Sequence, residues 1–342
     1  MRDLARAGRG LAQSERPVGT GGHGRSGTEL SRVPAGRASL AFRPFALALT
    51  FVTLLPGAGL AHEHWFAPSR FTAAGREPVA ICVRIGEGLC GPARPYRAVR
   101  TVRLLARTDR TLDLAPFASE GDTVWARFAA ADGGGALVAW ESNFVTHGME
   151  GGRFDAYLEQ EGLDSALALR RAARDTSAGR ERYRRCSKLW LAGERGPVPS
   201  RAPKSPASPS KPLGPSRSAE RATAALGLPL EIVPLDLPGE KSELTVRVLF
   251  AGRPLGGALV QAWHVPFAAD GSPRICAEER IGVAAAWRGR TTADGVVRVP
   301  CAEAGQWLIG AVHMVRSSVP AEADWESTWA SLGFGRAAID VR

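Results

Sequence analysis

The chain has 342 residues, a formal net charge of +10, five cysteines and six histidines. The charge is unevenly spread, because residues 1–61 carry a net +5 and residues 170–221 a net +10, which leaves the rest at −5. A folded part with a mildly acidic balance argues against a nucleic-acid partner and is compatible with a cationic ligand. The length that remains after residue 61 predicts two domains.

Residues 1–61 are predicted to be a disordered leader followed by a signal peptide. An apolar run of 11 residues extends from Phe45 to Leu55, which is too short for a membrane span and typical of a signal-peptide core. Gly59-Leu60-Ala61 then offers small residues to a signal peptidase. We therefore expect cleavage between Ala61 and His62, and a periplasmic or secreted mature protein.

Residues 62–192 are predicted to form a β-rich N-terminal domain with a helical segment. Runs of β-branched and aromatic residues between turn residues predict strands at 78–85, 98–106, 122–130 and 136–143. Apolar residues at helical spacing predict a pair of amphipathic helices within 153–175. We interpret the basic stretch 179–193 as a further helix.

Residues 193–226 are predicted to be a Pro/Ser-rich linker. Its centre, 196–218, holds seven prolines and almost no apolar residue, so it cannot form a core and should be extended. Composition leaves open whether this stretch separates two domains or bulges from one unit.

Residues 227–342 are predicted to form a C-terminal antiparallel β-sandwich of immunoglobulin-like type, so the fold class is mainly β. The pattern of 243–265 is strand, turn, strand, and 289–300 is typical of a hairpin with Asp294-Gly295 in its turn. Further strands are expected at 305–315 and 324–335. Several short strands with frequent turns favour a sandwich.

Several signatures of catalysis are missing from the sequence. There is no Gly-rich phosphate loop, no G-x-S-x-G elbow, no H-E-x-x-H and no paired C-x-x-C. Glu63 alone separates His62 from His64. This separation is one residue shorter than any spacing that lets two histidines of one helix bind the same metal ion. We therefore expect that the protein is not an enzyme.

Cleavage before His62 would create a terminus suited to a transition metal. The α-amine, two peptide nitrogens and the imidazole of His64 can lie in one plane around Cu(II) or Ni(II), which favour square-planar nitrogen coordination. In a second geometry, the amine and imidazole of His62 chelate the ion, and another imidazole from elsewhere in the fold completes a brace. The alternative is that both histidines are ordinary polar residues at a strand end.

His313 is the third candidate ligand, although a lone histidine in an apolar strand is more often a core residue. His264 is similar, and His147 is expected in a surface loop. Three acids at strand ends could add carboxylate oxygens, but most such acids are simply solvated. They are Glu141, Asp324 and Glu326.

The five cysteines suit disulfides in an exported chain. Cys82 and Cys90 could close one loop, and Cys276 and Cys301 could link strands of the sandwich, which would leave Cys186 unpaired. The sequence does not fix this pairing.

Several ordered segments together resemble the DUF 4198 family, described as periplasmic components of cobalt or nickel uptake systems, including NikK-like subunits. The resemblance covers most of residues 61–335, and its segments are "AHEHWFAPSRF" (61–71), "RIGEG" (84–88), "FDAYLEQEGLD" (154–164), "GRERYRRCSK" (179–188), "VHMV" (312–315) and "ADWESTWASLGF" (323–334). His62 and His313 match the family's motif. His64 departs from it, since an aromatic or aliphatic residue is common there, and the Pro/Ser-rich stretch is an addition.

The resemblance implies capture of Ni(II) or Co(II), and its delivery to membrane-embedded importer subunits. The metal ligands expected here are His62, His64 and His313, with Cu(II) as an alternative ion. Two other functions stay open: a copper oxygenase with a histidine brace, and a cell-surface β-sandwich interaction module whose terminal histidines are incidental.

Overall fold

The computed structural model describes residues 63–73, 77–129, 133–193, 217–276 and 283–337. The predicted leader and signal peptide, His62 and most of the Pro/Ser-rich stretch lie outside the described residues. The described residues all belong to one compact unit, which extends from Leu55. No helix among them is both long enough and apolar enough to cross a bilayer.

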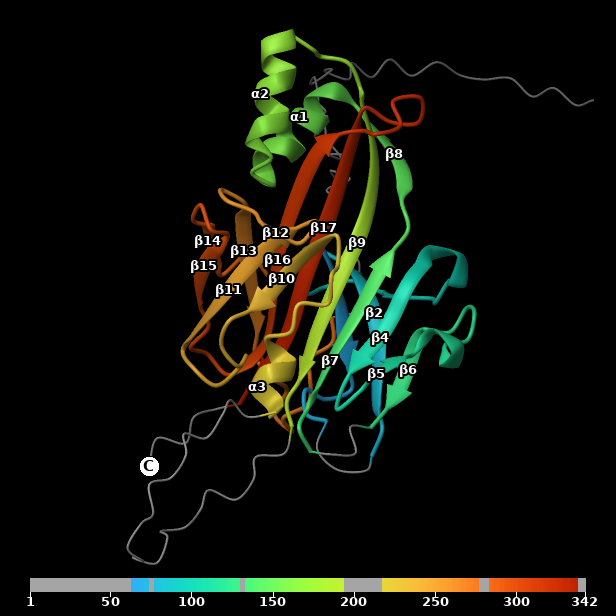
Figure 1. The fold of residues 1–342 in the computed structure, drawn as a ribbon, viewed down its shortest axis with the longest axis vertical. Helices are drawn as coiled ribbons and strands as arrows, with labels where there is room; N and C mark the ends of the chain where they lie inside the picture. Colours follow the sequence, from blue (N-terminus) through green and yellow to red (C-terminus); the bar gives the residue numbers. More distant parts are fainter. Residues whose placement is uncertain (1–62, 74–76, 130–132, 194–216, 277–282, 338–342) are drawn as a thin grey trace, which may run out of the picture. The chain divides into compact units, whose positions relative to one another are not determined.

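The described part of the chain is mainly β, with few short helices (Figure 1). Up to the Pro/Ser-rich stretch its elements are β1 (Glu63–Pro68), β2 (Val79–Gly86), β3 (Ala93–Arg94), η1 (Ala98–Arg100), β4 (Thr101–Arg107), β5 (Thr111–Asp113), η2 (Ala115–Phe117), β6 (Val124–Phe128), β7 (Ala136–Ser142), β8 (Val145–Met149), α1 (Gly151–Gln160), α2 (Asp164–Ala173) and β9 (Gly179–Leu191). After it come α3 (Arg217–Ala222), β10 (Leu230–Pro234), β11 (Glu243–Phe250), β12 (Arg253–Pro254), β13 (Leu259–Val265), β14 (Trp287–Arg290), β15 (Val296–Pro300), β16 (Gly305–Arg316) and β17 (Trp325–Arg336).

The strands form three sheets. The large sheet has nine strands in the order β14-β13-β16-β17-β9-β7-β4-β5, with β8 paired to β9. One small sheet contains β1-β2-β3 with β6, and we call it the N-terminal sheet. The other contains β10-β11-β12 with β15, and we call it the C-terminal sheet. The fold is therefore a set of mixed sheets and not clearly an immunoglobulin-like sandwich.

Strand β9 joins the two halves of the chain. It pairs with β17 in parallel, with Cys186 opposite Ala330, and with β7 in antiparallel orientation. Figure 1 shows β7, β9, β17 and β16 running side by side. The segments 62–192 and 227–342, which we expected to be separate domains, thus share one sheet.

The small sheets cover opposite faces of the large sheet. Along β9, Leu189 and Leu191 pack in the core beneath the N-terminal sheet, whereas Trp190 packs beneath the C-terminal sheet. Along β16, Leu308 faces the N-terminal side and Ile309 the other. This alternation follows from the period of two in a β-strand.

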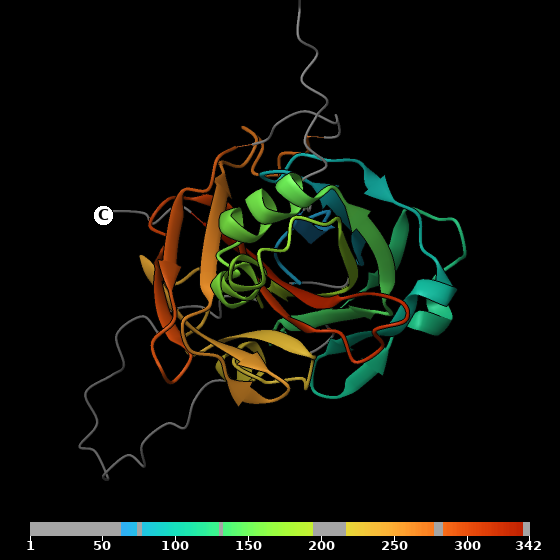
Figure 2. The ribbon, with the colours of Figure 1, turned by 90° about the horizontal axis from the view of Figure 1, so that it is seen from above.

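Helices α1 and α2 cover one end of the large sheet, as seen from above in Figure 2. Their apolar faces pack on β16 and β17 through Phe154, Tyr157 and Leu158, which meet Val312 and Trp329. The side chain of Glu150 caps α1 by accepting hydrogen bonds from two backbone N–H groups, 2.9 and 3.0 Å away. The predicted pair of amphipathic helices is confirmed.

Two sequence interpretations were wrong. The basic stretch 179–193 is largely strand β9 and not a helix. The turn at Asp294-Gly295 exists, with Thr292 Oγ1 donating to Asp294 at 2.5 Å, but β14 pairs with β13 and β15 with β11. The turn therefore connects two sheets instead of closing a hairpin.

Candidate functional site

Strand β1 carries the histidine of the predicted terminal motif into the interior. His64 is opposite Ile85 in the ladder with β2, and its side chain is only 1% exposed. The ring meets the edge of Trp140, with 6.2 Å between centroids, and it hydrogen-bonds the backbone of Cys186. Its Nε2 atom is buried and has no hydrogen-bond partner among the described residues.

The surroundings of His64 keep the imidazole neutral. Burial, and next the charge of Arg185, lower its pKa well below the ordinary value. A neutral ring that uses one nitrogen for a hydrogen bond presents the other as a lone pair. An unpaired polar atom in the interior costs free energy, so Nε2 of His64 is a candidate ligand-binding atom.

Two acidic residues line the same small cavity as His64. Glu63 is the first residue of β1, and Glu161 is the C-cap of α1. The cavity measures about 10 Å³, which is room for one water-sized group. Its walls come from β13, α1, β16, β17 and the start of β1: Glu63, His64, Glu161, Gln261, Trp263, Leu308, Gly310, Ala311, Val312, Trp329, Ala330 and Ser331.

Burial shifts both carboxyl groups toward their protonated forms. It raises the pKa of Glu63 to about 7, although the Gly88 N–H donates to its carboxylate at 3.3 Å. Burial and then the charge of Glu63 raise the pKa of Glu161 to about 8, while the Gln261 amide donates to it at 3.0 Å. Because the Glu63 charge disfavours ionisation of Glu161, a cation close to both would be stabilised.

A further buried acid lies next to this cavity. Glu181 of β9 accepts hydrogen bonds from the Tyr157 hydroxyl at 3.1 Å and from the Ser327 hydroxyl. Tyr157 stacks on Trp329, which lines the cavity, with 6.1 Å between ring centroids. Burial raises the pKa of Glu181 as well. Sequence analysis missed Glu161 and Glu181, because neither belongs to a recognisable motif.

The turn after β2 supports Glu63, and it explains two glycines of the "RIGEG" segment. A Cβ on Gly86 would lie 2.0 Å from the Cys90 carbonyl oxygen. Gly88 has a φ of +53°, and a Cβ there would lie 2.0 Å from the Val283 carbonyl oxygen. Only glycine fits this close packing, which brings the Gly88 N–H to the Glu63 carboxylate.

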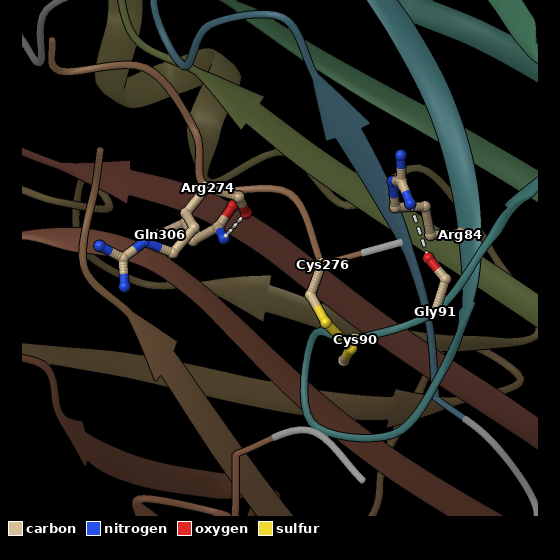
Figure 3. The surroundings of a disulfide bond; sticks show 6 residues. All are labelled: Arg84, Cys90, Gly91, Arg274, Cys276 and Gln306. Atoms are coloured by element: carbon tan, nitrogen blue, oxygen red, sulfur yellow. Dashed lines mark hydrogen bonds between the residues drawn. A yellow bond between two sulfur atoms is a disulfide. The ribbon is translucent and has the colours of Figure 1, made fainter. Parts of the chain in front are cut away.

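A disulfide links this turn to the C-terminal half of the chain. Cys90 is bonded to Cys276, as Figure 3 shows, and not to Cys82. Cys82, Cys186 and Cys301 carry free thiols. Both proposed pairings were therefore wrong, because a partner distant in sequence is brought next to Cys90 by the fold.

Two hydrogen bonds from side chains to backbone carbonyls flank the disulfide. Arg84 Nη1 donates to the Gly91 carbonyl at 2.6 Å, and Gln306 Nε2 donates to the Arg274 carbonyl at 2.7 Å (Figure 3). The turn that holds Glu63 is thus tied both covalently and by hydrogen bonds.

The structure does not bring His313 to this cavity. On β16, Val312 and Met314 pack with the helices, while His313 points to the opposite face. There its ring contacts Phe250 of the C-terminal sheet, with 4.4 Å between centroids. His313 and His64 therefore cannot bind one ion in this fold.

None of the other candidates lines this cavity. His264 uses both ring nitrogens, at 3.1 Å from a Glu303 carboxylate oxygen and 3.0 Å from the Ala304 carbonyl oxygen. His147 is exposed on β8. The three acids pair with arginines: Glu141 with Arg103 at 2.7 Å, Asp324 with Arg180 at 2.8 Å and Glu326 with Arg182 at 2.6 Å.

The described residues contain no group of three or more His, Cys, Asp or Glu side chains placed to hold a metal ion. His62 lies outside them, so the full set of predicted ligands is not visible. The planar motif also conflicts with β1, because residues 63 and 64 are held in the ladder with β2 and the His64 ring faces inward. Wrapping this backbone around an ion would require the strand to leave the sheet.

Comparisons with known proteins give one match. Residues 59–315 match the family described as "Domain of unknown function (DUF4198)". No curated protein and no solved structure matches the chain. Because the match covers most of the chain, including β1, the cavity walls on α1 and β13 and most of β16, the protein belongs to the DUF4198 family.

Proposed function

We propose that this protein is an exported metal-binding protein that captures Ni(II) or Co(II) for membrane-embedded uptake subunits, and that it is not an enzyme. The expected role is that of NikK-like periplasmic components. The observation that carries the proposal is the buried Nε2 atom of His64, which lacks a partner among the described residues and belongs to a residue lining the cavity with Glu63 and Glu161.

The chemistry of these three groups suits a divalent ion. A neutral imidazole is a common ligand for nickel and cobalt, and carboxylate oxygens can complete a mixed nitrogen and oxygen set. Burial and then the charge of Glu63 raise the pKa of Glu161, and a dication would offset both. The ion would therefore satisfy an orphaned nitrogen and balance two buried acids.

The remaining ligands would come from the cleaved terminus. Glu63 is the first described residue, so the α-amine and imidazole of His62 would be one residue from the cavity. In an extended chain, residues two apart project to the same side, which would put His62 on the side of His64. We propose that His62 and His64 together bind the ion, with carboxylate support.

Copper chemistry is the main alternative. A histidine-brace oxygenase would use the same terminal amine with Cu(II), but it would also need a substrate beside the metal. A cell-surface interaction module would bind no metal at this terminus. A mature protein without bound metal would favour the interaction module over both metal-binding functions. Peroxide-driven oxidation of a substrate would support the oxygenase.

The decisive experiment compares two proteins that differ by one residue. One begins at His62, as after signal-peptide cleavage, and the other carries an additional Gly before His62. We expect the Gly-extended protein to bind Ni(II) more than tenfold more weakly in calorimetry, a loss of over about 1.4 kcal/mol. His147→Ala is the matched control, because its ring is exposed on β8 and far in sequence from the terminus.

Equal Ni(II) affinity in the two proteins would rule out a terminal site. Fractionation of cells producing the full chain, with mass spectrometry of the mature terminus, tests export. Recovery of the protein with residues 1–61 still attached would contradict both the proposed location and the proposed site.

A further inference from the structure

The turn between α1 and α2 carries Glu161, and two arginines at the edge of the large sheet contact this turn. Gln160 ends α1, Glu161 follows it as the C-cap, and Asp164 begins α2. Strand β14 lies at one end of the large sheet and pairs with β13 (Figure 1). Its Arg288 and Arg290 are exposed and, being two residues apart, project to one side of the strand. Neither arginine lines the cavity.

Both arginines donate to the turn or to the helix after it. Arg288 Nη2 donates a hydrogen bond to the carbonyl oxygen of Gln160, one of the last carbonyls of α1, which have no partner within a helix. Arg290 Nη2 forms an ion pair with Asp164 at 2.7 Å. The Nη1 atom of Arg290 donates to the Gly257 carbonyl at 2.7 Å. One guanidinium group thus connects α2 to the chain just before β13.

The turn packs closely against β13 and β14. Gly162 has a φ of +63°, the left-handed conformation that commonly ends a helix. A Cβ at this position would lie 2.8 Å from the Cβ of Leu259 and 3.1 Å from Arg290 Nη2. Leu259 is opposite Arg290 in the ladder of β13 and β14, so these two side chains form one surface against the turn. Only glycine allows the turn to come this close to the two strands.

This contact connects the arginines to the cavity. Gln261 is opposite Arg288 in the same ladder, and its amide donates to the Glu161 carboxylate at 3.0 Å. Gln261 and Glu161 both line the cavity. One pair of strands therefore holds the main chain of the turn through Arg288 and the side chain of Glu161 through Gln261.

We propose that Arg288 and Arg290 are positioning residues of the metal site, which hold the α1–α2 turn against β13 and thereby keep Glu161 at the cavity. This inference rests on the proposed metal-binding function. Partners that orient a metal ligand from outside commonly change the metal affinity by about 10- to 100-fold when they are removed. Exposed ion pairs add little to the free energy of folding, so loss of the two arginines should affect the site more than the fold.

The test measures Ni(II) binding by the mature chain that begins at His62, with and without the double substitution Arg288→Gln, Arg290→Gln. We expect the double variant to bind Ni(II) about tenfold more weakly in calorimetry, while its urea midpoint stays close to that of the original. Arg290→Gln alone should give a smaller loss in the same direction. Removal of positive charges near a cation would by itself strengthen binding, so the loss cannot be a charge effect. Unchanged or tighter Ni(II) binding would overturn the proposal.

The same substitutions in a Glu161→Gln background separate positioning from a general effect on the fold. A neutral amide is a poor metal ligand, so the position of the turn should no longer matter, and Arg288→Gln with Arg290→Gln should change the affinity by less than about twofold. An equal loss in both backgrounds would mean that the arginines act on the whole fold, which contradicts the proposed role. Arg298→Gln is the matched control, since this exposed arginine also lies on a short strand but pairs with Glu243 in the C-terminal sheet.

The two proposals fail in different ways. If the original protein binds no Ni(II), the metal-binding function is wrong, and hydrogen exchange of the metal-free proteins decides whether the arginines hold the turn. We expect the double variant to exchange the amides of Glu161, Gly162 and Leu163 faster, because these amides donate the hydrogen bonds that end α1, while the amides of β16 keep their rates. If the original binds Ni(II) and exchange in the turn is the same in the variant, the metal site stands and the arginines do not position Glu161.

Discussion

Glu63 and Glu161 line one small cavity, although the first begins a strand and the second follows a helix. Their pKa values, about 7 and about 8, both lie above the ordinary value of 4.5. The folded protein therefore holds protons that the unfolded chain releases. This arrangement ties the stability of the metal-free protein to pH.

We predict that the metal-free protein loses stability as pH rises from about 5 to about 8. A group whose pKa is raised by folding contributes its full stability below the unfolded value, and this contribution disappears as pH passes the folded value. Glu161→Gln should remove much of this slope and stabilise the protein at pH 8 by on the order of 2 kcal/mol. Urea unfolding at pH 5 and pH 8 measures both effects, with Glu159→Gln, on the exposed side of the same helix, as the control.

A second prediction concerns the thiols. Under denaturing, non-reducing conditions we expect three cysteines to react with a thiol reagent, namely Cys82, Cys186 and Cys301. Peptide mapping should find Cys90 joined to Cys276. A single reactive cysteine would contradict the described pairing and favour the two shorter loops that the sequence suggested.

Loss of the disulfide should destabilise the protein strongly. The bond closes a loop with a sequence separation of 186 residues, and the chain-entropy account assigns about 5 kcal/mol to a loop of this length. The double variant Cys90→Ser, Cys276→Ser should therefore unfold at a much lower urea concentration than the original. Cys82→Ser, which removes a half-buried free thiol, is the control and should change stability little.

Sequence patterns predicted the local elements better than their partners. The strands expected at 78–85, 98–106 and 136–143 correspond to β2, β4 and β7, since runs of β-branched and aromatic residues between turn residues are a local property. Strand β9 was misread because its many arginines suggested a basic helix. Two of their partners are Asp324, just before β17, and Glu326 of β17; each is 144 positions away, and no local pattern reveals them.

The candidate site was also predicted only in part, because the fold brings together residues that are distant in sequence. His64 was recognised from its position after the predicted cleavage point. Glu161 was missed, because an acid at the end of a helix is usually solvated and only the fold brings it to β1. His313 was expected to join His64, but strand alternation places it on the other face of the large sheet.

A fourth prediction follows from the parallel pairing of β9 with β17. Trypsin should cut first within 194–216, which holds basic residues and many prolines, as expected for the stretch 196–218 from sequence alone. The two fragments should then stay together on gel filtration even after reduction, because β9 contributes a central strand to the shared sheet. Fragments that separate under native, reducing conditions would show that the halves are independent domains.

The last prediction compares the two histidines that the family motif and the terminus suggested as partners. His64→Ala should weaken Ni(II) binding by the mature protein more than tenfold, because it removes the buried, unpartnered Nε2 atom of a residue that lines the cavity with Glu63 and Glu161. His313→Ala should leave the affinity within twofold, since this ring packs on Phe250 beneath the C-terminal sheet. Calorimetry at pH 7.5 on both variants, with circular dichroism to confirm folding, makes the comparison. A large loss for His313→Ala with none for His64→Ala would mean that the ion binds on the other face of the large sheet, and that the cavity at β1 is not its site.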